Sequence, residues 1–359
     1  MEQKTITVVF NINENYLPYC AVTMASILKN ASSHVFFDFC ILSIEHLGNA
    51  AEQIKISGYE NYKIRNITVD VSTIKNLHLA TYGQKHVTID AYLRCYIPLI
   101  FNNIDKCIYL DVDLVLNTDI ERLYDIDLKD YYAGAVVETN YYAIFTPSLR
   151  KECRDNFIKK YDIKNEFYFN SAVIIFNLKK IRDDEEENLI IDTAKTYRNG
   201  EFLLFPDQDF ITIAYQGNNK GKMMPIDVRW NPFQIPRLPS DNLYIIHWCG
   251  GNKPWKNFNV PHIKIFLEYA KLTQFYPKIR DTLLEAVEDK LDYLNSKLLY
   301  KKYVRRLKLF DVRIFGKEVF PKTAGRCRRK IDDFMRQKNE RKLYLDYLME
   351  LKAYLNEQI

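Results

Sequence analysis

The sequence predicts an α/β protein with a mixed, mostly parallel central sheet, followed by a helical and basic C-terminal extension. Strand-like and helix-like segments alternate up to about residue 261, the order expected when helices connect parallel strands. Several of the strand-like segments are apolar at nearly every position, which is typical of strands covered on both faces. After Pro261 only helical periodicity remains. We therefore place a domain boundary there, between residues 1–261 and 262–359.

The first segments already show a strand, a polar turn and a helix in that order. Residues 5–10 (Thr-Ile-Thr-Val-Val-Phe) have strand composition, residues 11–15 are polar, and residues 17–28 have helical periodicity. This order begins a nucleotide-binding α/β fold. Further strands are expected at 35–43, 63–71, 107–110, 132–137 and 169–177, and helices at 48–57 and, up to Pro98, at 92–100. The acidic run 183–187 is expected to open another helix, where its charge suits the positive end of the dipole.

The C-terminal region differs from the rest in periodicity and in charge. Helical patterns cover 262–274, 279–309 and 327–356, with a turn-rich connector at 310–326. Residues 297–342 contain 17 Lys and Arg against 5 Asp and Glu, a net charge of +12, whereas residues 1–296 contain 33 against 38, a net charge of −5. The basic character of the chain is therefore local.

Composition is that of an ordinary globular protein, with 47% hydrophobic and 27% charged residues. No run approaches the roughly 20 apolar residues needed to span a bilayer, and the N-terminus shows no signal-peptide core. We therefore expect a cytoplasmic protein. The seven cysteines are scattered singly without a Cys-x-x-Cys motif, which favours reduced, buried thiols over zinc sites or disulfides.

Two aspartates directly behind an apolar strand form the most informative motif. Asp111 and Asp113 are two residues apart, and side chains at this spacing on extended backbone share a face. Paired carboxylates at a strand end suit a hard divalent cation that keeps positions free for phosphate oxygens. Aspartate pairs near strand ends are also common on surfaces, but the apolar residues around this pair place it within a core element. The motif therefore indicates, in outline, a nucleotide-sugar site.

Six motifs follow one another in a characteristic order. They are Val-Val-Phe-Asn-Ile-Asn-Glu-Asn-Tyr (8–16), Ala-Tyr-Leu-Arg (91–94), Tyr-Leu-Asp-Val-Asp (109–113), Tyr-Phe-Asn-Ser-Ala-Val (168–173), Asp-Gln-Asp (207–209) and His-Trp-Cys-Gly-Gly-Asn-Lys-Pro-Trp (247–255). Together they resemble glycosyltransferase family 8, which includes bacterial lipopolysaccharide galactosyl- and glucosyltransferases and the glycogenins. The resemblance covers roughly residues 5–258 and implies a GT-A type nucleotide-sugar-binding domain.

The resemblance implies a metal site formed by Asp111, Asp113 and His247. An imidazole beside two carboxylates moves the preference from Mg²⁺ toward Mn²⁺, so Mn²⁺ is the expected cofactor and Mg²⁺ the alternative. A histidine before a tryptophan is more often structural, but the surrounding nonapeptide favours a ligand. Lys253 would bring a cation to the leaving group.

The resemblance also implies which residues hold the donor. Asn11, Asn13 and Asn15 occupy the turn where the family binds uracil and ribose, although many relatives carry an acid where Asn13 stands, and asparagines are also common in turns for conformational reasons. Gly250 and Gly251 would let the backbone approach the diphosphate, unless they only form a turn. The other expected donor-binding residues are Arg94, Val112, Asn170 and Lys253.

Catalytic roles are implied for Asp207, Gln208 and Asp209, together with Lys253. Asp207 would bond sugar hydroxyls, and Gln208 would lie nearest the anomeric carbon. An amide is a poor nucleophile, so the two-carboxylate mechanism of glycosidases does not transfer directly. His86, which lies just before Arg94 in the sequence, fits a structural role at least as well as a functional one.

The expected function is a metal-dependent retaining transfer of a hexose from UDP-glucose or UDP-galactose to a hydroxyl of a cell-surface glycan or lipid-linked oligosaccharide. Two alternatives remain open. One is a glycogenin-like protein that glucosylates itself, for which 26 tyrosines offer acceptors. The other is a catalytically lapsed module that binds UDP-sugar or glycan.

The basic segment suggests a location. Residues 301–310 and 326–330 mix cations with apolar and aromatic residues, and anionic lipid headgroups attract such surfaces. We expect peripheral association with the inner face of the plasma membrane. The alternatives are a solvated helical appendage and a contact between subunits of a homo-oligomer. No nucleic-acid motif accompanies the charge, so nucleic acid is not an expected partner.

Overall fold

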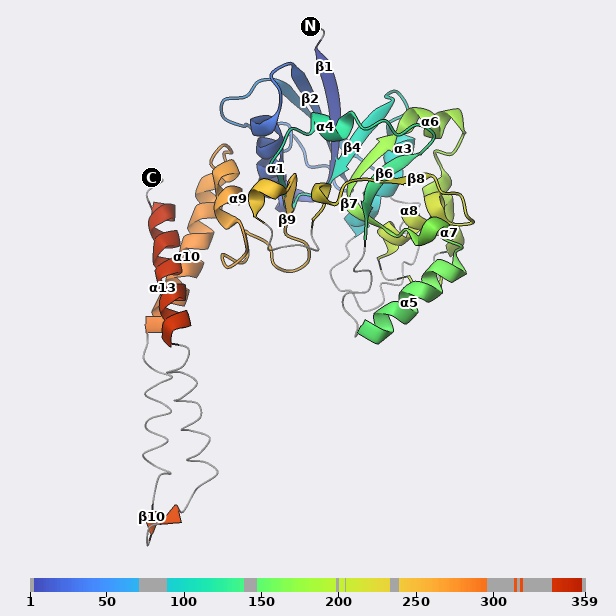
Figure 1. The fold of residues 1–359 in the computed structure, drawn as a ribbon. Helices are drawn as coiled ribbons and strands as arrows, with labels where there is room; N and C mark the ends of the chain where they lie inside the picture. The colour runs from blue at the N-terminus through green and yellow to red at the C-terminus, as the bar shows by residue number, and fades with distance from the viewer. Residues whose placement is uncertain are drawn as a thin grey trace. The chain divides into compact units, whose positions relative to one another are not determined.

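The computed structural model describes residues 3–70, 89–138, 147–197, 200–203, 205–232, 239–295, 313–314, 317–318 and 338–356. The chain forms one compact unit from Met1–Pro254 and Asn259–Tyr276, and a second from Trp255–Phe258 and Pro277–Ile359 (Figure 1). We call them unit 1 and unit 2. The predicted α/β class is confirmed in unit 1. The domain boundary at 261 remains a prediction. The helix that follows this residue groups with unit 1.

Unit 1 is built on a mixed sheet that has, within the described residues, seven strands in the order β3-β2-β1-β4-β7-β6-β8. These strands are β1 (Lys4–Asn11), β2 (Val35–Ser43), β3 (Tyr62–Thr68), β4 (Lys106–Leu110), β6 (Ala133–Val137), β7 (Phe169–Asn177) and β8 (Met223–Pro225). β7 runs antiparallel to both of its neighbours, and the other pairs are parallel. The mostly parallel sheet is therefore as predicted, with β7 as the reversed strand.

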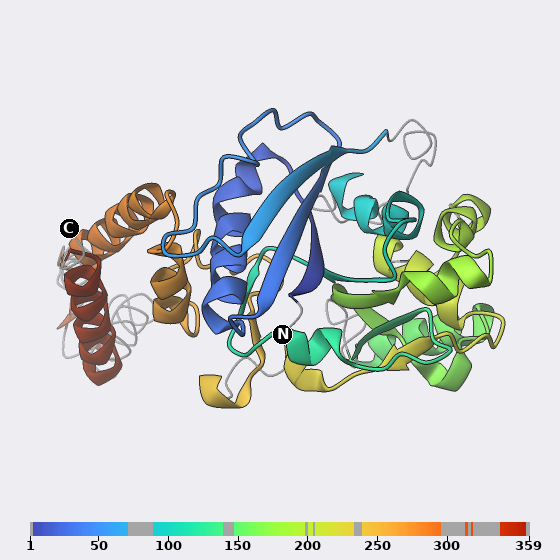
Figure 2. The same cartoon turned by 90° about the horizontal axis from the view of Figure 1, so that it is seen from above.

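Both faces of the sheet are buried, as the apolar strands predicted. Val9 pairs with Cys40 and Tyr109 and belongs to a core cluster that also includes residues of the helices η2 (Ile89–Tyr96), α7 (Leu189–Tyr197) and α8 (Pro206–Gln216). Its neighbour Val8 pairs with Phe39 and Ile108 and points to the opposite face. Helix α1 (Leu17–Asn30) lies beside β1 and β2 on that face (Figure 2). Helices therefore cover the central strands on both sides.

The helices of unit 1 are mostly short. They are η1 (Glu14–Tyr16), α1 (Leu17–Asn30), η2 (Ile89–Tyr96), α3 (Ile97–Ile100), α4 (Glu121–Tyr124), α5 (Pro147–Lys160), η3 (Lys164–Glu166), α6 (Leu178–Asp183), α7 (Leu189–Tyr197), α8 (Pro206–Gln216), η4 (Val228–Trp230), η5 (Ser240–Asn242) and α9 (Ile263–Ala270). A separate two-stranded sheet pairs β5 (Leu114–Leu116) with β9 (Ile245–His247).

Two predicted helices are wrong. Residues 48–57 form turns instead of a helix, and tertiary contacts hold the end of the segment: Lys55 N–H donates to Gln274 Oε1 at 2.9 Å, and Ile56 bridges to Thr273. The acidic run 183–187 does not open a helix, since it ends α6 and links it to α7. The predicted buried thiols are confirmed at Cys20, Cys40, Cys95 and Cys107, whereas Cys249 is exposed.

Unit 2 contains α10 (Tyr276–Asn295), α13 (Lys338–Asn356) and the hairpin strands β10 (Arg313–Ile314) and β11 (Lys317–Glu318). One face of α13 is buried, since Leu348, Leu351 and Leu355 are fully buried, and Lys352 pairs with Glu288 of α10 at 2.6 Å. The basic stretches 301–310 and 326–330 lie outside the described residues. In the described part of the chain, every helix is too short or too polar to cross a bilayer.

Candidate active site

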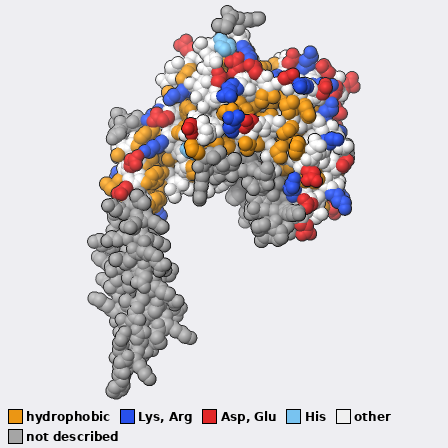
Figure 3. All heavy atoms as spheres, in the orientation of Figure 1, with side chains coloured by type: hydrophobic (Ala, Val, Ile, Leu, Met, Phe, Trp, Pro, Cys, Tyr) orange, Lys and Arg blue, Asp and Glu red, His pale blue; other side chains and the backbone are white. Residues whose placement is uncertain are grey.

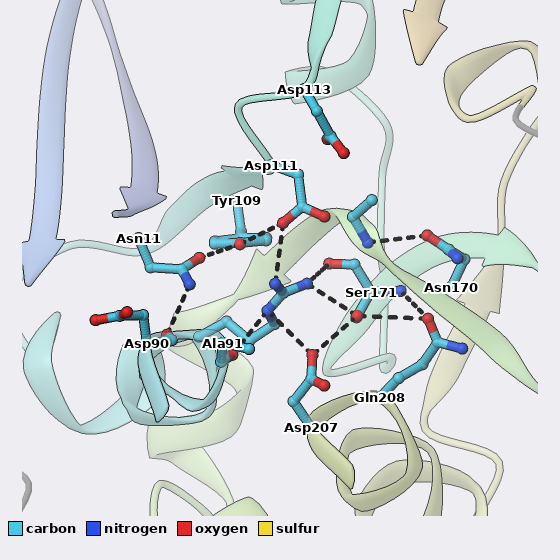
Figure 4. A network of polar contacts seen from close by, with 12 residues as sticks. Asn11, Asp90, Ala91, Tyr109, Asp111, Asp113, Asn170, Ser171, Asp207 and Gln208 are labelled. Carbon is cyan, nitrogen blue, oxygen red and sulfur yellow. Dashed lines mark hydrogen bonds and ion pairs between the residues drawn. The ribbon is translucent and has the colours of Figure 1, made fainter. Parts of the chain in front are cut away.

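The candidate site lies at the edge of the main sheet where β1 and β4 end and β7 begins. β1 and β4 are parallel and end at Asn11 and Leu110. β7 is antiparallel to β4, with Val173 opposite Leu110, so its first residues lie at the same edge. Asn170 from β7 and Asp111 from the end of β4 therefore lie in one network (Figure 4). The topology brings together residues that are far apart in the sequence.

Asp111, Asp113 and His247 meet at this edge, as the motifs predicted. The two aspartates lie in the link between β4 of the main sheet and β5 of the small sheet. β9 pairs with β5 so that His247 lies opposite Leu114, and Trp248 N–H donates to Asp113 O at 2.9 Å. One potential ligand atom from each of the three side chains lies within 4.8 Å of the others. The small sheet is thus the element that carries His247 to the aspartates.

These three side chains fit a divalent cation in chemistry and in spacing. Oδ1 of Asp113 and Nε2 of His247 are 3.1 Å apart. Two ligands at a right angle on an octahedral ion, each bonded at about 2.1 Å, would be separated by about 3 Å. Two carboxylates with one imidazole suit Mn²⁺ better than Mg²⁺. The set can therefore hold a divalent cation.

Lys253 lies beside the same aspartate. Its ammonium pairs with Oδ2 of Asp113 and donates to the carbonyl of Trp248 at 3.0 Å. Burial alone would raise the pKa of the Asp113 carboxyl, but His247 and Lys253 outweigh burial and hold that pKa well below its ordinary value. Burial alone would lower the pKa of Lys253, but the charge of Asp113 outweighs it and raises that pKa. Both groups therefore keep their charges at neutral pH.

Arg94, on η2, connects the first aspartate to α8. Its guanidinium pairs with Asp111 at 3.0 Å and with Asp207 at 3.3 Å, and it donates to the carbonyl and hydroxyl of Ser171 at 2.8 and 2.9 Å (Figure 4). It also stacks on the ring of Tyr109, 4.6 Å from the ring centroid. Arg94 is buried, so this planar fork of donors holds several elements at fixed positions.

The asparagine turn after β1 is tied to the start of η2. Asn11 Nδ2 donates to Asp90 O at 2.7 Å, and Asn11 Oδ1 contacts the hydroxyl of Tyr109. Asn13 Nδ2 donates to the Asp90 carboxylate at 3.3 Å, while Asn13 Oδ1 accepts from Asn15 N–H at 3.1 Å. Asn11 and Asn13 therefore have the conformational role that asparagine turns commonly have. Asn15 is exposed, and its side chain remains a predicted donor contact.

The start of α8 places two predicted catalytic residues against β7. Gln208 Oε1 accepts from Ser171 N–H at 2.9 Å, and the Ser171 hydroxyl lies 3.2 Å from Asp207 Oδ2. Burial raises the pKa of Asp207, although the neighbouring Arg94 opposes this. Ser171 thus connects Arg94, Asp207 and Gln208 in one network.

Asp209 is held differently from its two neighbours. Its side chain is fully buried, with Oδ1 accepting from the Tyr168 hydroxyl at 2.7 Å and Oδ2 from Phe205 N–H at 2.8 Å. Gln208 Nε2 donates to the same Tyr168 hydroxyl at 3.0 Å. These bonds fix the first turn of α8. Asp209 thus holds this turn in place, and its catalytic role remains a prediction.

The loop after β9 carries the predicted glycines. Gly250 has φ +78°, a backbone conformation that favours glycine, and a Cβ at Gly250 or Gly251 would meet no protein atom within 4 Å. Conformation therefore favours glycine at position 250, and both glycines have open space beside the backbone. An approach of the diphosphate to them remains a prediction. Val112 is buried between the two aspartates. His86 lies outside the described residues.

Several residues of the site were missed from the sequence. Ser171 and Tyr109 lie inside quoted motifs, so the motifs themselves could have indicated them. Glu138, directly after β6, is buried and accepts from Asn170 Nδ2 at 3.1 Å. Asn231, after η4, is fully buried and bonds both Asn170 and His247. Neither has a periodic or spacing signal, because both reach the site only through tertiary structure.

A family model described as glycosyl transferase family 8 matches residues 7–259 of this chain. A protein of Haemophilus influenzae is 27% identical over 272 residues, which cover 70% of this chain and 73% of that protein. The lipopolysaccharide 1,2-glucosyltransferase of Escherichia coli is 24% identical over 270 residues, which cover 72% of this chain and 75% of that enzyme.

Solved structures share the fold. The galactosyltransferase LgtC, crystallised with donor and acceptor sugar analogs, matches with a TM-score of 0.56 at 20% identity, over 75% of this chain and 96% of LgtC. The bifunctional glycosyltransferase WbbM matches with a TM-score of 0.61 at 19% identity over 79% of this chain. The present chain spans about half of WbbM, 52% of its length. The predicted GT-A fold is thereby confirmed.

Proposed function

The chain belongs to glycosyltransferase family 8, and we propose that it is a metal-dependent retaining hexosyltransferase whose donor is UDP-glucose or UDP-galactose. The proposed acceptor is a hydroxyl of a cell-surface glycan or lipid-linked oligosaccharide. The observation that carries the proposal is the meeting of Asp111, Asp113 and His247 at one sheet edge, with Lys253 on Asp113. Two relatives named as a glucosyltransferase and a galactosyltransferase support a hexose as the transferred group.

The residues of the site divide the work on the donor. A divalent cation held by Asp111, Asp113 and His247 would supply positive charge against the donor phosphates. Lys253 would turn its ammonium to the departing diphosphate and share its negative charge. Asp207, a buried carboxylate next to Arg94, would accept hydrogen bonds from sugar hydroxyls. Charge is thus provided at the leaving group, and hydrogen bonds are provided at the sugar.

The carboxamide of Gln208 favours a path without a covalent glycosyl-enzyme intermediate. We propose that the bond from C1 to the phosphate oxygen breaks as the acceptor hydroxyl enters from the same face. The hydroxyl proton then passes to the departing phosphate oxygen, and the configuration at C1 is retained. Ser171 N–H fixes the carbonyl oxygen of Gln208 at 2.9 Å, and this oxygen could stabilise positive charge on the sugar.

A donor panel tests this proposal. The full-length protein is incubated with UDP-glucose, UDP-galactose and GDP-mannose, with Mn²⁺, Mg²⁺ or a chelator, and released nucleoside diphosphate is measured. We expect release from one UDP-hexose, dependent on divalent cation. Release with chelator equal to that with Mn²⁺ would contradict metal dependence. Intact-mass measurement of the same samples would show added hexoses if the protein glucosylates itself.

We also propose that the basic segment 297–342 associates with anionic membrane. On the face of unit 1 drawn in Figure 3, Lys and Arg side chains are interspersed with Asp and Glu, so that face offers no large area of one charge. The excess charge of +12 belongs to the segment itself. Anionic headgroups attract such cations by about 1 kcal/mol each.

Removal of the whole C-terminus after Ser296 would be a poor test, because it removes α13 with its buried leucines. Charge neutralisation avoids this problem. Replacement by Gln of six residues of the segment should weaken binding to anionic liposomes and leave UDP-sugar hydrolysis unchanged; these residues are Lys301, Lys302, Arg305, Arg306, Arg328 and Arg329. Equal liposome binding by the variant and the wild type would refute the proposal. Liposomes without anionic lipid are the control.

A further inference from the structure

A line of buried amide side chains runs from β7 to His247. Asn231 is fully buried, and Asn170 is buried. Asn231 Nδ2 lies 2.6 Å from Asn170 Oδ1, and Asn231 Oδ1 lies 2.8 Å from Nδ1 of His247. Buried amides this close must present a donor to each acceptor, because an unmatched pair is costly away from water.

The backbone of β7 fixes the orientation of the first amide. The N–H of Ala172 can only donate, and the atom of Asn170 that lies 3.0 Å from it is therefore the carbonyl oxygen, Oδ1. At the other side of the amide, Nδ2 faces the carboxylate of Glu138 at 3.1 Å. Exchange of the two atoms would place a donor against a donor and an acceptor against an acceptor. The orientation of Asn170 thus follows from its surroundings.

The same reasoning passes from Asn170 to the histidine. Asn170 Oδ1 is an acceptor, so Asn231 must present Nδ2 to it, and Asn231 Oδ1 then faces the ring of His247. A carbonyl oxygen can only accept, so Nδ1 of His247 must carry a hydrogen. A neutral imidazole has one N–H, and its lone pair is then on Nε2. Nε2 lies 3.1 Å from Oδ1 of Asp113, which can also only accept, so without metal the ring carries a second hydrogen on Nε2. A bound cation takes the place of that hydrogen, while Nδ1 keeps its own.

We propose that Asn231 is a positioning residue that fixes His247 in the Nδ1–H tautomer and so aims the Nε2 lone pair at the metal site. The proposal rests on the proposed metal site, because the Nε2 lone pair is available only when a cation binds there. A hydrogen-bond acceptor on the far nitrogen of a metal-binding histidine fixes ring orientation and raises its basicity. In this role Asn231 itself touches neither the sugar donor nor the acceptor substrate.

Ala172 connects this line to the other side of the site. Its N–H sets the orientation of Asn170, and its carbonyl accepts from the N–H of Asp111 at 2.8 Å. One residue of β7 therefore determines the position of Asp111 and, through Asn170 and Asn231, the tautomer of His247. The metal-binding groups are aligned by the central sheet, although His247 belongs to the small one.

The direct test is the nitrogen NMR spectrum of the full-length protein with ¹⁵N-labelled histidine, recorded with saturating Zn²⁺, a diamagnetic cation, and without donor. The pH is raised until the ring signals stop shifting, and His247→Gln assigns the signals. We expect protonated Nδ1 and unprotonated Nε2 for His247. The reverse tautomer in the wild-type protein overturns the proposal, whatever any variant does and whether or not the protein transfers sugar.

Two variants connect the tautomer to metal binding. Asn231→Leu removes the acceptor at similar volume, and we expect loss of the single tautomer with a 10- to 100-fold weaker Mn²⁺ affinity, read from the free-ion EPR signal. Asn231→Asp retains an acceptor for Nδ1–H and should keep the tautomer, with affinity closer to wild type. The proposal is overturned if Asn231→Leu keeps the wild-type tautomer of His247 and the wild-type Mn²⁺ affinity. It is also overturned if both variants lose the same Mn²⁺ affinity while the tautomer of His247 is unchanged.

A matched control separates this effect from general destabilisation. Asn177 lies at the other end of β7, where its amide bonds Lys129 O and Tyr131 O and accepts from Lys180 N–H. Asn177→Ala removes comparable bonds far from His247, so it should lower the melting temperature without change in the His247 signals or in Mn²⁺ affinity. If Asn231→Leu does not fold, the wild-type spectrum and Asn231→Asp decide the question.

Discussion

Replacement of Arg94 by Met should strongly destabilise unit 1, because it removes the cation shared by two carboxylates. The guanidinium lies 3.0 Å from Asp111 and 3.3 Å from Asp207, and only 6% of Arg94 is exposed. Removal of one partner of a buried ion pair costs about 3–5 kcal/mol. The side chain of Asp111 is 26% exposed and can be partly rehydrated, whereas that of Asp207 is 10% exposed. We therefore expect the free energy of unfolding to fall by about 3–4 kcal/mol.

Urea denaturation followed by circular dichroism measures this loss. Arg154→Met is the matched control, because Arg154 pairs with Glu166 at 3.8 Å at an exposed position. Such a pair contributes about 0–1 kcal/mol. The double variant Arg94→Met with Asp207→Asn should recover about 1–2 kcal/mol, since the uncompensated charge is removed with its partner. A loss below about 1 kcal/mol in Arg94→Met, or no recovery in the double variant, would refute the reasoning.

Two further predictions concern Asp113 and the neighbouring ammonium of Lys253. Lys253→Met should lower kcat by about 100-fold or more, since charge at the leaving group is lost, while Mn²⁺ affinity without nucleotide should not fall, because Lys253 supplies no ligand atom. Steady-state kinetics measure kcat, and EPR measures Mn²⁺ affinity. Lys256→Met, at an exposed position, is the control. Weaker Mn²⁺ binding by Lys253→Met would contradict the assignment of Lys253 to the leaving group. Because the pKa of Asp113 is lowered in the folded protein, its contribution to stability should be present above the unfolded pKa of about 3.9 and lost as pH falls through the lower folded value. Melting temperatures are measured in the presence of chelator between about pH 6 and about pH 2.5, and they should fall more steeply for wild type than for Asp113→Asn. Parallel melting-temperature curves for the two proteins would contradict the lowered pKa of Asp113.

The parts of the site that could be predicted from the sequence are those held by local backbone. Asp111 and Asp113 follow an apolar strand within a few residues, and their exposure to a sheet edge follows from that position alone. The break of the chain into a second sheet at this point was not predicted, because Leu114–Leu116 is as apolar as β4. Only its pairing with β9, more than a hundred residues later, shows that it belongs elsewhere.

The parts that could not be predicted depend on distant contacts. Asn231 has the composition of an ordinary turn residue, and its role arises only because it is buried against Asn170 and His247. Residues 48–57 have helical composition, but pairing with Thr273 and Gln274 outweighs that preference. In both cases the deciding partner is remote in the sequence, so neither periodicity nor spacing carries the signal.

The most direct test of the central claim is Mn²⁺-dependent UDP release by Asp113→Asn compared with wild type. The amide conserves the shape of the side chain but removes the anionic oxygen that a hard cation needs. We expect a fold unchanged by circular dichroism and UDP release reduced by about 1,000-fold or more, with Mn²⁺ affinity lowered as well. Full Mn²⁺-dependent turnover in Asp113→Asn would contradict the assignment of Asp111, Asp113 and His247 as the metal site of this glycosyltransferase.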